Sequence, residues 1–189
     1  MGYDAIVIGV SSGGLNVLTK LLPSLPQNYP IPIVIVQHLS PRSDGYWIES
    51  MDKLCKLFVK EANEKEQIER GNIYMAPANY HLLVEKDRTF SLSTESKVNF
   101  ARPSIDVLFE SAAEVYRNEL IGIILTGSNS DGALGLKKIK EEGGLTIVQD
   151  PETAESPSMP AHAISTSSVD YILPIEEIQK LLIQLGKSG

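Results

Sequence analysis

The sequence predicts an α/β fold: a doubly wound, mostly parallel sheet flanked by helices, with an antiparallel hairpin, in a Rossmann-like three-layer architecture. Runs of β-branched residues alternate with helical patterns along the chain, which is typical of βαβ units around a parallel sheet. The runs are apolar almost throughout, as expected for strands that helices cover on both faces. With 189 residues and no internal repeat or low-complexity linker, we expect a single domain over residues 1–189.

Two buried strands with a helix between them are expected at the start of the chain. The apolar runs 4–9 (DAIVIG) and 33–37 (IVIVQ) have strand length. After the first run, a glycine pair opens a helix over residues 14–22, and prolines punctuate the connection over residues 23–32.

A helix is expected next, over residues 45–57. Trp47, Met51 and Leu54 lie on one face of it. Trp47 and Met51 are candidates to line a ligand pocket, but their spacing favours packing in the core. The charged run 60–70 (KEANEKEQIER) that follows indicates a solvated surface.

The rest of the chain adds a hairpin and then returns to alternating strands and helices. Two short runs joined at Asp87 and Arg88 predict an antiparallel hairpin attached to the sheet. Pro103 favours a helix start, and Gly143 with Gly144 forms a normal C-terminal helix signal. The expected elements are, in order, strands 73–76, 81–86 and 89–93, helix 103–116, strand 120–126, helix 131–142, strand 145–148, a Ser/Pro-rich stretch over 151–160, strand 171–173 and a helix from about residue 175.

Composition excludes several classes of protein. The net charge is −7, from 17 basic and 24 acidic residues, which is the wrong sign for a nucleic-acid module. No apolar run approaches the roughly 18 residues that span a bilayer, and no basic leader follows Met1, so we expect neither membrane insertion nor a signal peptide. The single cysteine, Cys55, allows no internal disulfide and no cysteine metal cluster, and it fits a reducing cytoplasm.

Unusual polar residues follow three of the expected strands. These stretches are GVSSGG at 9–14, QHLS at 37–40 and TGSNSDG at 126–132. In an open parallel sheet, reactive groups collect outside the carboxyl ends of the strands. We therefore expect the functional site at this edge.

Residues 9–13 match G-x-S-x-G, a strand–turn–helix elbow that exposes a serine hydroxyl, here that of Ser11. The helix amides after Ser12 would stabilise negative charge. A dinucleotide fingerprint lacks its glycine at position 11, and a P-loop lacks its lysine because Leu15 follows Gly14. From the pattern alone, a nucleophile, an anion-binding turn and a plain turn all remain open.

A serine nucleophile needs a base and an acid that orients the base. His38 follows a strand, His162 lies in the Ser/Pro-rich stretch, and His81, in the hairpin, is expected to be a surface or packing residue. Asp131 follows a buried strand, where its alternative role is to cap the next helix. Two triads remain open: Ser11–His38–Asp131 and Ser11–Asp131–His162. Placement at a strand end favours His38.

Six segments carry a resemblance that runs over nearly the whole chain. They are IGVSSGG (8–14), VQHLSP (36–41), YMAPANYHL (74–82), RPSIDVLFESAA (102–113), GIILTGSNSDGALG (122–135) and AESPSMPAHAI (154–164). In this order they resemble the catalytic domain of CheB-type chemotaxis protein-glutamate methylesterases. The resemblance implies a doubly wound α/β domain with an antiparallel hairpin, in agreement with the fold predicted above.

The resemblance also implies an activity and a set of roles. The family's nucleophile, base and acid fall on Ser11, His38 and Asp131, and its oxyanion donors are suggested to be the backbone amides of His38 and Ser128. The implied reaction is hydrolysis of glutamate γ-methyl esters on the cytoplasmic helices of methyl-accepting chemoreceptors, with deamidation of glutamine side chains as a second activity. No metal and no organic cofactor is implied.

Some features depart from the family. The family often has Thr at Ser12, Met-Gly at Ser128 and Asn129, and an aromatic residue with Gly where this chain has Pro157 and Ser158. Loss of the glycine at Asn129 limits the φ angles of the loop. Many members carry an N-terminal receiver domain, and none is expected here. A partner methyltransferase or a separate regulator is a further candidate partner, and a non-catalytic signalling or scaffold domain that binds receptors is the alternative function.

Overall fold

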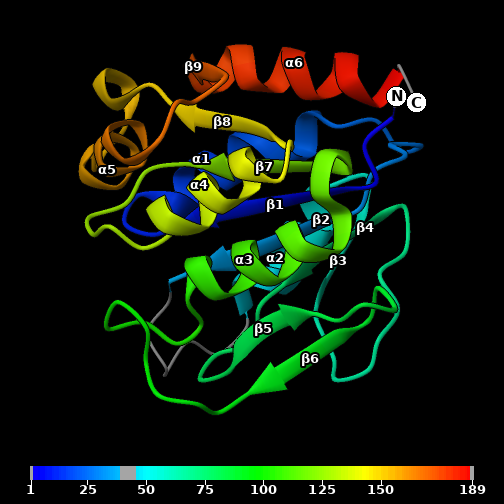
Figure 1. Cartoon of the computed structure of the whole chain (residues 1–189). Coiled ribbons are helices and arrows are strands. Elements are labelled where there is room, and N and C mark those ends of the chain that lie inside the picture. Colours follow the sequence, from blue (N-terminus) through cyan, green and yellow to red (C-terminus); the bar gives the residue numbers. More distant parts are fainter. Residues whose placement is uncertain (1, 39–45, 188–189) are drawn as a thin grey trace.

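The computed structural model describes residues 2–38 and 46–187. Within them a seven-stranded parallel sheet has the order β3-β4-β2-β1-β7-β8-β9 (Figure 1). Its strands are β1 (Ala5–Val10), β2 (Ile33–Gln37), β3 (Phe58–Glu61), β4 (Asn72–Met75), β7 (Leu120–Ile124), β8 (Leu145–Gln149) and β9 (Tyr171–Leu173). The expectations that concern Met1, Leu39, Ser40 and Gly45 lie outside the described residues.

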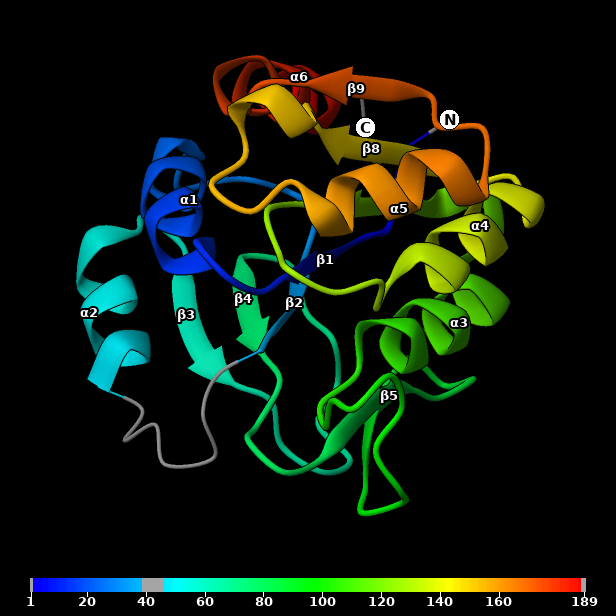
Figure 2. The same cartoon turned by 90° about the vertical axis from the view of Figure 1, so that its left-hand side faces the viewer.

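Helices cover both faces of the sheet (Figure 2). One face carries α1 (Gly14–Leu21), α2 (Tyr46–Leu54) and α6 (Ile175–Lys187), and the other carries α3 (Ile105–Tyr116), α4 (Ala133–Glu141) and α5 (Ser158–Thr166). Side chains of β1 alternate between the two resulting cores, and every residue of this strand is buried. The predicted three-layer fold is therefore confirmed. Trp47 and Met51 pack in the first core, as expected from their spacing.

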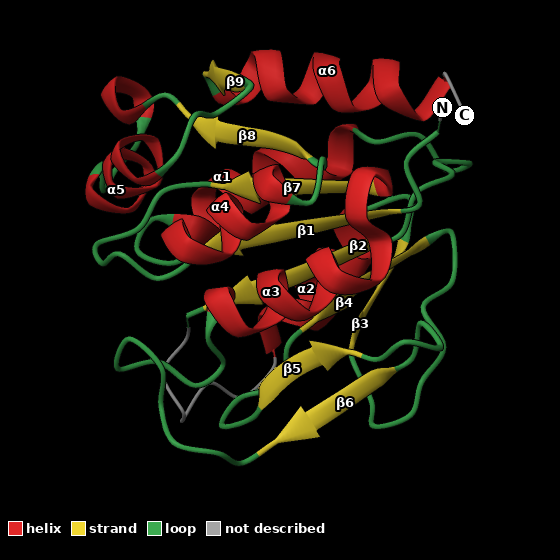
Figure 3. Cartoon of the chain, viewed as in Figure 1, coloured by secondary structure: helices red, strands yellow, loops and turns green. Residues whose placement is uncertain are grey.

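The predicted antiparallel hairpin forms, but it does not extend the main sheet. β5 (His81–Val84) and β6 (Phe90–Ser93) make a separate two-stranded sheet, with Arg88 at φ 63° in the turn (Figure 3). Leu82, Val84 and Phe90 are buried against the helix face that includes α3. The hairpin is thus held to the domain by side-chain packing rather than by strand pairing.

Within the described residues, no helix is both long and apolar enough to cross a lipid bilayer.

Two elements are absent from the sequence prediction, each for a local reason. β3 lies at the sheet edge and only Val59 among its residues is buried, so it lacks an apolar run. α5 begins at Ser158, near the end of the Ser/Pro-rich stretch over 151–160, and continues to Thr166, where no helix was expected. Pro160 lies in the first turn, where a backbone N–H has no helical partner in any case, and Met159 and Ala163 fill the core.

Strand order brings three strand ends together. β1 pairs with β2, with Val10 opposite Gln37, and pairs with β7 on its other side. Because the three strands are parallel, the chain leaves them at the same edge, where Ser11 and His38 follow β1 and β2. The strand order reverses at β1, which has β2 on one side and β7 on the other, and ligands in such sheets usually bind outside the carboxyl ends of the strands at this point.

We predict that Gly9→Ala lowers the free energy of unfolding by about 1–3 kcal/mol, measured by urea denaturation, because of overpacking. A Cβ at position 9 would lie 2.3 Å from Cγ2 of Ile105, the first residue of α3. In an Ile105→Ala background this clash is absent, so the same substitution should cost less there. An equal loss in both backgrounds would show that the close approach of α3 is not the reason.

Candidate active site

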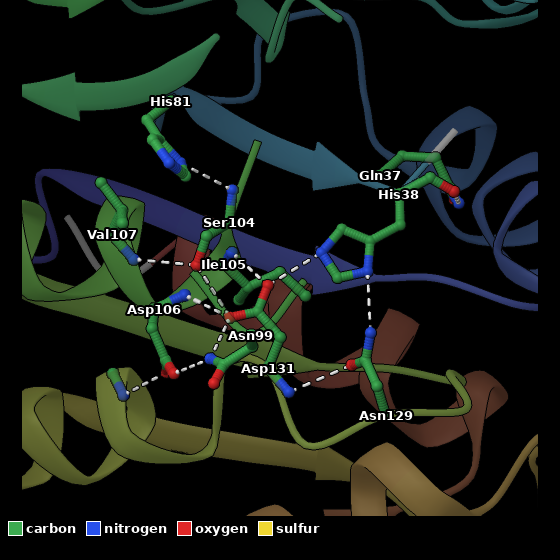
Figure 4. A network of polar contacts seen from close by, with 11 residues as sticks. Gln37, His38, His81, Asn99, Ser104, Ile105, Asp106, Val107, Asn129 and Asp131 are labelled. Atoms are coloured by element: carbon green, nitrogen blue, oxygen red, sulfur yellow. Dashed lines mark hydrogen bonds and ion pairs between the residues drawn. The ribbon is translucent and has the colours of Figure 1, made fainter. Parts of the chain in front are cut away.

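A buried carboxylate lies at the centre of the site. Asp131 lies in the loop between β7 and α4, and its side chain is 0% exposed. Five groups donate hydrogen bonds to it (Figure 4). The donors are Ser104 Oγ at 2.8 Å, Asn99 Nδ2 at 3.0 Å and the Asp106 N–H at 3.1 Å on Oδ1, with the Ile105 N–H at 2.7 Å and His38 Nε2 at 2.8 Å on Oδ2. Both oxygens are therefore fully hydrogen-bonded.

The N-terminus of α3 supplies much of this environment. Its first N–H groups have no partner inside the helix, and the helix dipole places partial positive charge there. Burial alone would raise the pKa of the Asp131 carboxyl, but hydrogen bonds from His38, Asn99, Ile105 and Asp106 outweigh it and lower the pKa below its ordinary value. Asp131 is thus an anion at neutral pH.

Asp131 was also a candidate to cap the helix that follows it, α4, and the structure shows that it does not. The N-cap of the following helix, α4, is Gly132, and no side chain caps it. Asp131 instead accepts from the first turn of α3, which lies earlier in the chain. The residue therefore satisfies helix amides and orients a histidine at the same time.

A second buried carboxylate lies beside the first. Asp106 Oδ1 accepts the Gly135 N–H at 2.7 Å, and Asn99 Nδ2 lies 2.7 Å from Asp106 Oδ2 as well as 3.0 Å from Asp131 Oδ1. Burial raises the pKa of the Asp106 carboxyl, and the charge of Asp131 adds to that rise, against the opposing effect of these hydrogen bonds. The Asn99 amide therefore stabilises two like charges by donating to both.

His38 is fixed from its backbone and from both ring nitrogens. Its N–H donates to the Val10 carbonyl at 3.1 Å, which continues the pairing of β2 with β1. Nε2 lies 2.8 Å from Asp131 Oδ2, and Nδ1 lies 3.3 Å from Asn129 Nδ2 (Figure 4). The side chain is 13% exposed. The ring is thus half-buried and oriented at the rim of the sheet.

Ser11 lies next to His38 on the neighbouring strand. Its N–H donates to the Thr126 carbonyl at 2.9 Å, and its carbonyl accepts from Gln37 Nε2 at 3.0 Å. Ser11 Oγ makes no hydrogen bond to any residue in the described part of the chain, His38 included. Both residues line one pocket of ≈ 330 Å³, together with Asn129 and the loop that carries Lys97 and Arg102. The predicted nucleophile and base thus share a cavity but are not hydrogen-bonded.

The two predicted oxyanion donors differ. The His38 N–H is engaged with Val10 in the sheet, so its prediction as an oxyanion donor is not compatible with this geometry. The Ser128 N–H has no hydrogen-bond partner among the described residues. The same holds for the N–H groups of Ser12 and Gly13 in the turn that enters α1, where Gly13 has a φ of 78°. The N–H groups of Ser128 and of the α1 entrance are therefore candidate donors to an oxyanion.

The other two histidines lie outside this constellation. His81 is buried, with Nδ1 accepting the Ser104 N–H at 3.2 Å and Nε2 2.9 Å from the Ser96 carbonyl, which fits its expected packing role. His162 is exposed on α5, and its Nδ1 lies 2.7 Å from the Ser158 carbonyl. Asp131 has no contact with His162. The geometry therefore brings together Asp131 and His38 from the first triad, and not the second.

Three residues of the site have no place in the sequence prediction as partners of the triad: Asn99, Ser104 and Asn129. Asn99 lies in a tight turn, with φ values of 50° and 64° at positions 99 and 100, and nothing local in the sequence indicates that its amide reaches Asp131. Ser104 lies within the helix expected over residues 103–116, and the sequence predicts no contact between its hydroxyl and Asp131. For Asn129 the sequence does offer an indication, since a side-chain amide two residues before the predicted acid is well placed to contact the base.

Within the described residues, no group of His, Cys, Asp or Glu side chains is arranged to hold a metal ion.

Comparisons with known proteins agree on one family. A family model described as CheB methylesterase matches residues 6–182. A protein of Leptospira interrogans serogroup Icterohaemorrhagiae serovar copenhageni (strain Fiocruz L1-130) is 61% identical over 189 residues, which cover 100% of this chain and 98% of that protein. The protein-glutamate methylesterase/protein-glutamine glutaminase of Thermotoga maritima is 38% identical over 183 residues, which cover 95% of this chain and 53% of that protein.

A solved structure matches over the same extent. The crystal structure of the Thermotoga maritima CheB methylesterase catalytic domain has a TM-score of 0.92 to this chain at 37% sequence identity. The match covers 98% of this chain and 100% of that one. The chain therefore spans about half the length of the full Thermotoga protein and the whole of its catalytic domain.

We predict that Asn99→Gly lowers the free energy of unfolding at pH 7 by about 1–3 kcal/mol, because Asp106 and Asp131 lose a shared donor. Without it, the carboxyl pKa values in the folded state rise. The pKa of Asp106 is already raised in the folded chain, so a further rise adds a penalty to the folded state that fades as the pH falls through the folded-state pKa of this residue. The pKa of Asp131 is lowered in the folded chain, so its share of the loss persists to lower pH. The difference from the wild type should therefore narrow toward pH 4 in denaturant titrations.

Phe100→Gly is the matched control for that measurement. Phe100 is the other residue of the turn with positive φ, and it is 98% exposed. The Phe100→Gly substitution changes the backbone freedom of the turn and leaves the hydrogen bonds of Asp106 and Asp131 in place. Its effect on the free energy of unfolding should therefore not vary with pH between 4 and 7. An Asn99→Gly loss that is equally insensitive to pH would contradict the role assigned to the amide.

Proposed function

The chain belongs to the CheB methylesterase family, and on that premise we propose that it hydrolyses glutamate γ-methyl esters with Ser11 as nucleophile, His38 as base and Asp131 as orienting acid. The substrates are the cytoplasmic helices of methyl-accepting chemoreceptors. Deamidation of glutamine side chains follows from the same chemistry, with ammonia as the leaving group. The observation that carries the proposal is the His38–Asp131 pair, joined at 2.8 Å in the pocket that Ser11 also lines.

The reaction begins with proton transfer from Ser11. Nδ1 of His38, the ring nitrogen that does not face Asp131, accepts this proton as Oγ attacks the ester carbonyl carbon. Asp131 remains ionised and stabilises the imidazolium. Collapse of the tetrahedral intermediate releases methanol, which takes the proton from His38 and leaves a glutamyl ester on Ser11. A water molecule deprotonated by His38 attacks this ester, and His38 then returns the proton to Ser11 Oγ as the glutamate side chain of the receptor leaves with a free γ-carboxylate.

The negative charge on the carbonyl oxygen is held by backbone N–H groups. The free N–H of Ser128 and those of Ser12 and Gly13 at the entrance to α1 are the donors in this proposal. Each such donor is worth about 3–4 kcal/mol of transition-state stabilisation in comparable enzymes. The charged residues that line the pocket beside His38, Lys97 and Arg102, are both basic, which favours an acidic polypeptide as substrate.

A non-catalytic signalling or scaffold role that binds receptors is the second candidate. One observation favours it: Ser11 Oγ is not hydrogen-bonded to His38. Purified protein that binds methylated receptor tightly but releases no methanol would support this role over the esterase.

We predict that Ser11→Ala abolishes methanol release from methylated receptor, whereas Ser12→Ala retains most of it. Loss of the nucleophile in a triad costs on the order of 10⁶-fold in kcat. Ser12 is the matched control, because its hydroxyl is 3.0 Å from Ser128 Oγ and not directed to the base. The reverse order of activities would exchange the roles of the two serines.

The base is tested separately by comparing His38→Ala with His162→Ala. His38→Ala should lose activity by a factor similar to that of Ser11→Ala, since triad residues act as a unit. His162→Ala should behave like the wild type because, among the described residues, the His162 side chain is hydrogen-bonded only to Ser158 of its own helix. Methanol release that depends on His162 and not on His38 would overturn the assignment.

A further inference from the structure

We propose that Asn129 is a positioning residue for the base: it fixes the tautomer of His38 and, in the resting site, occupies the ring nitrogen that must accept the Ser11 proton. This inference rests on the proposed function, since it takes His38 as the base toward Ser11. Asn129 lies in the loop after β7, two residues before Asp131, and its amide bridges the Asp131 backbone and the imidazole (Figure 4).

The orientation of the Asn129 amide follows from its backbone contact. The N–H of Asp131 lies 3.0 Å from Asn129 Oδ1, and a backbone N–H can only donate. That end of the amide is therefore the carbonyl oxygen. The other end, which lies 3.3 Å from His38 Nδ1, is the NH2 group, which can only donate. It follows that Nδ1 of His38 is the acceptor and carries no proton.

The second ring nitrogen leads to the same tautomer. A neutral imidazole carries one proton, which must then be on Nε2. Nε2 faces Asp131 Oδ2 at 2.8 Å, and an ionised carboxylate can only accept. The opposite tautomer would place an N–H against the Asn129 NH2 group and a lone pair against a carboxylate. Asn129 and Asp131 therefore select one tautomer from opposite sides of the ring.

The same contact competes with the nucleophile. An unprotonated ring nitrogen offers a single lone pair in the plane of the ring, and Ser11 Oγ must donate to it in order to be activated. Ser11 Oγ makes no hydrogen bond within the described chain. The Asn129 contact is longer than the usual 2.9–3.0 Å for a nitrogen donor, so it is weak and readily exchanged. The Asn129 amide thus yields Nδ1 to Ser11 when substrate enters the pocket that all three residues line.

Two substitutions separate this role from simple support of the loop. Asn129→Asp keeps an oxygen for the Asp131 N–H but turns an acceptor toward Nδ1, which draws a proton onto that nitrogen. Asn129→Gly removes both contacts. If Asn129 only supports the loop, the Asp variant resembles the wild type and the Gly variant is impaired. If it acts on the base, the Asp variant is impaired and the Gly variant is not.

The experiment combines kinetics with nitrogen NMR of the histidine ring. For Asn129→Asp we expect kcat for methanol release to fall by up to about 10⁴-fold, as for a wrong-tautomer triad, with an unchanged KM. The Nδ1 resonance of His38 should change from an unprotonated to a protonated nitrogen. For Asn129→Gly we expect Ser11 to react about 2- to 10-fold faster with a small serine-directed phosphonate, since one competing hydrogen bond is gone.

Asn118→Asp is the charge-matched control. Asn118 is exposed in the short helical turn Arg117–Glu119 and is not among the residues that line the pocket with His38, so the substitution adds the same charge away from the base. It should leave kcat and the His38 resonances as in the wild type, and thermal unfolding of all three variants checks that they fold. An Asn129→Asp variant with wild-type kcat and an unprotonated Nδ1 would overturn the proposal.

The NMR measurement needs no turnover, so it also separates the two proposals. Wild-type protein that releases no methanol, but whose Nδ1 is unprotonated and becomes protonated in Asn129→Asp, would contradict the esterase and support the role of Asn129 in fixing the ring. Active protein with a protonated Nδ1 in the wild type would contradict the role of Asn129 and leave the esterase standing.

Discussion

The site depends on one contact, the burial of the Asp131 carboxylate against the N-terminus of α3. An isolated charge in the protein interior costs several kcal/mol, so it persists only where hydrogen bonds and opposite charge replace its water. The first amides of α3, the Ser104 hydroxyl and the Asn99 amide do so here. For these contacts to form, α3 must lie close to the sheet and to α4. Gly9 in β1 permits the first approach and Gly135 in α4 permits the second, because a Cβ at either position would collide with α3. The Asp131 carboxylate can therefore remain charged only if α3 is packed closely against the sheet and α4.

That constraint divides the site into a rigid part and a free part. Asp131 is fixed by five hydrogen bonds, and it fixes one nitrogen of His38, whose backbone is already paired within the sheet. The imidazole thus has little freedom to turn, and only its second nitrogen is available for proton transfer. Ser11 stands at the end of the adjacent strand, with its backbone bonded on two sides and its hydroxyl uncommitted. In the proposed function the proton relay is therefore completed by these side chains, since the backbones of both residues are already hydrogen-bonded.

The sequence was sufficient for the layered fold and for the edge where the site lies, because both follow from apolar periodicity and parallel strand order. It was insufficient where tertiary contacts decide. β3 has one buried residue, Val59, and α5 is held by Met159 and Ala163 despite its prolines, so neither has a local pattern. The two triads could not be separated by spacing, since the His162 position depends on the course of α5. The His38 N–H was expected to face an oxyanion, but pairing with β1 occupies it, which only the strand register reveals.

If Ser11 is the nucleophile, as proposed, the absence of a hydrogen bond from its hydroxyl within the described chain has a consequence for catalysis. An interaction accelerates a reaction only if it is stronger in the transition state than in the ground state. If Ser11 were hydrogen-bonded to His38 at rest, part of that bond's free energy would already stabilise the free enzyme. Here the lone pair of the base is satisfied by the weaker contact with Asn129, so a half-buried polar atom is not left unpaired while the pocket is empty. In the proposed mechanism, exchange of Asn129 for Ser11 adds a hydrogen bond from the nucleophile only when an ester is present to be attacked, which is when that bond lowers the barrier.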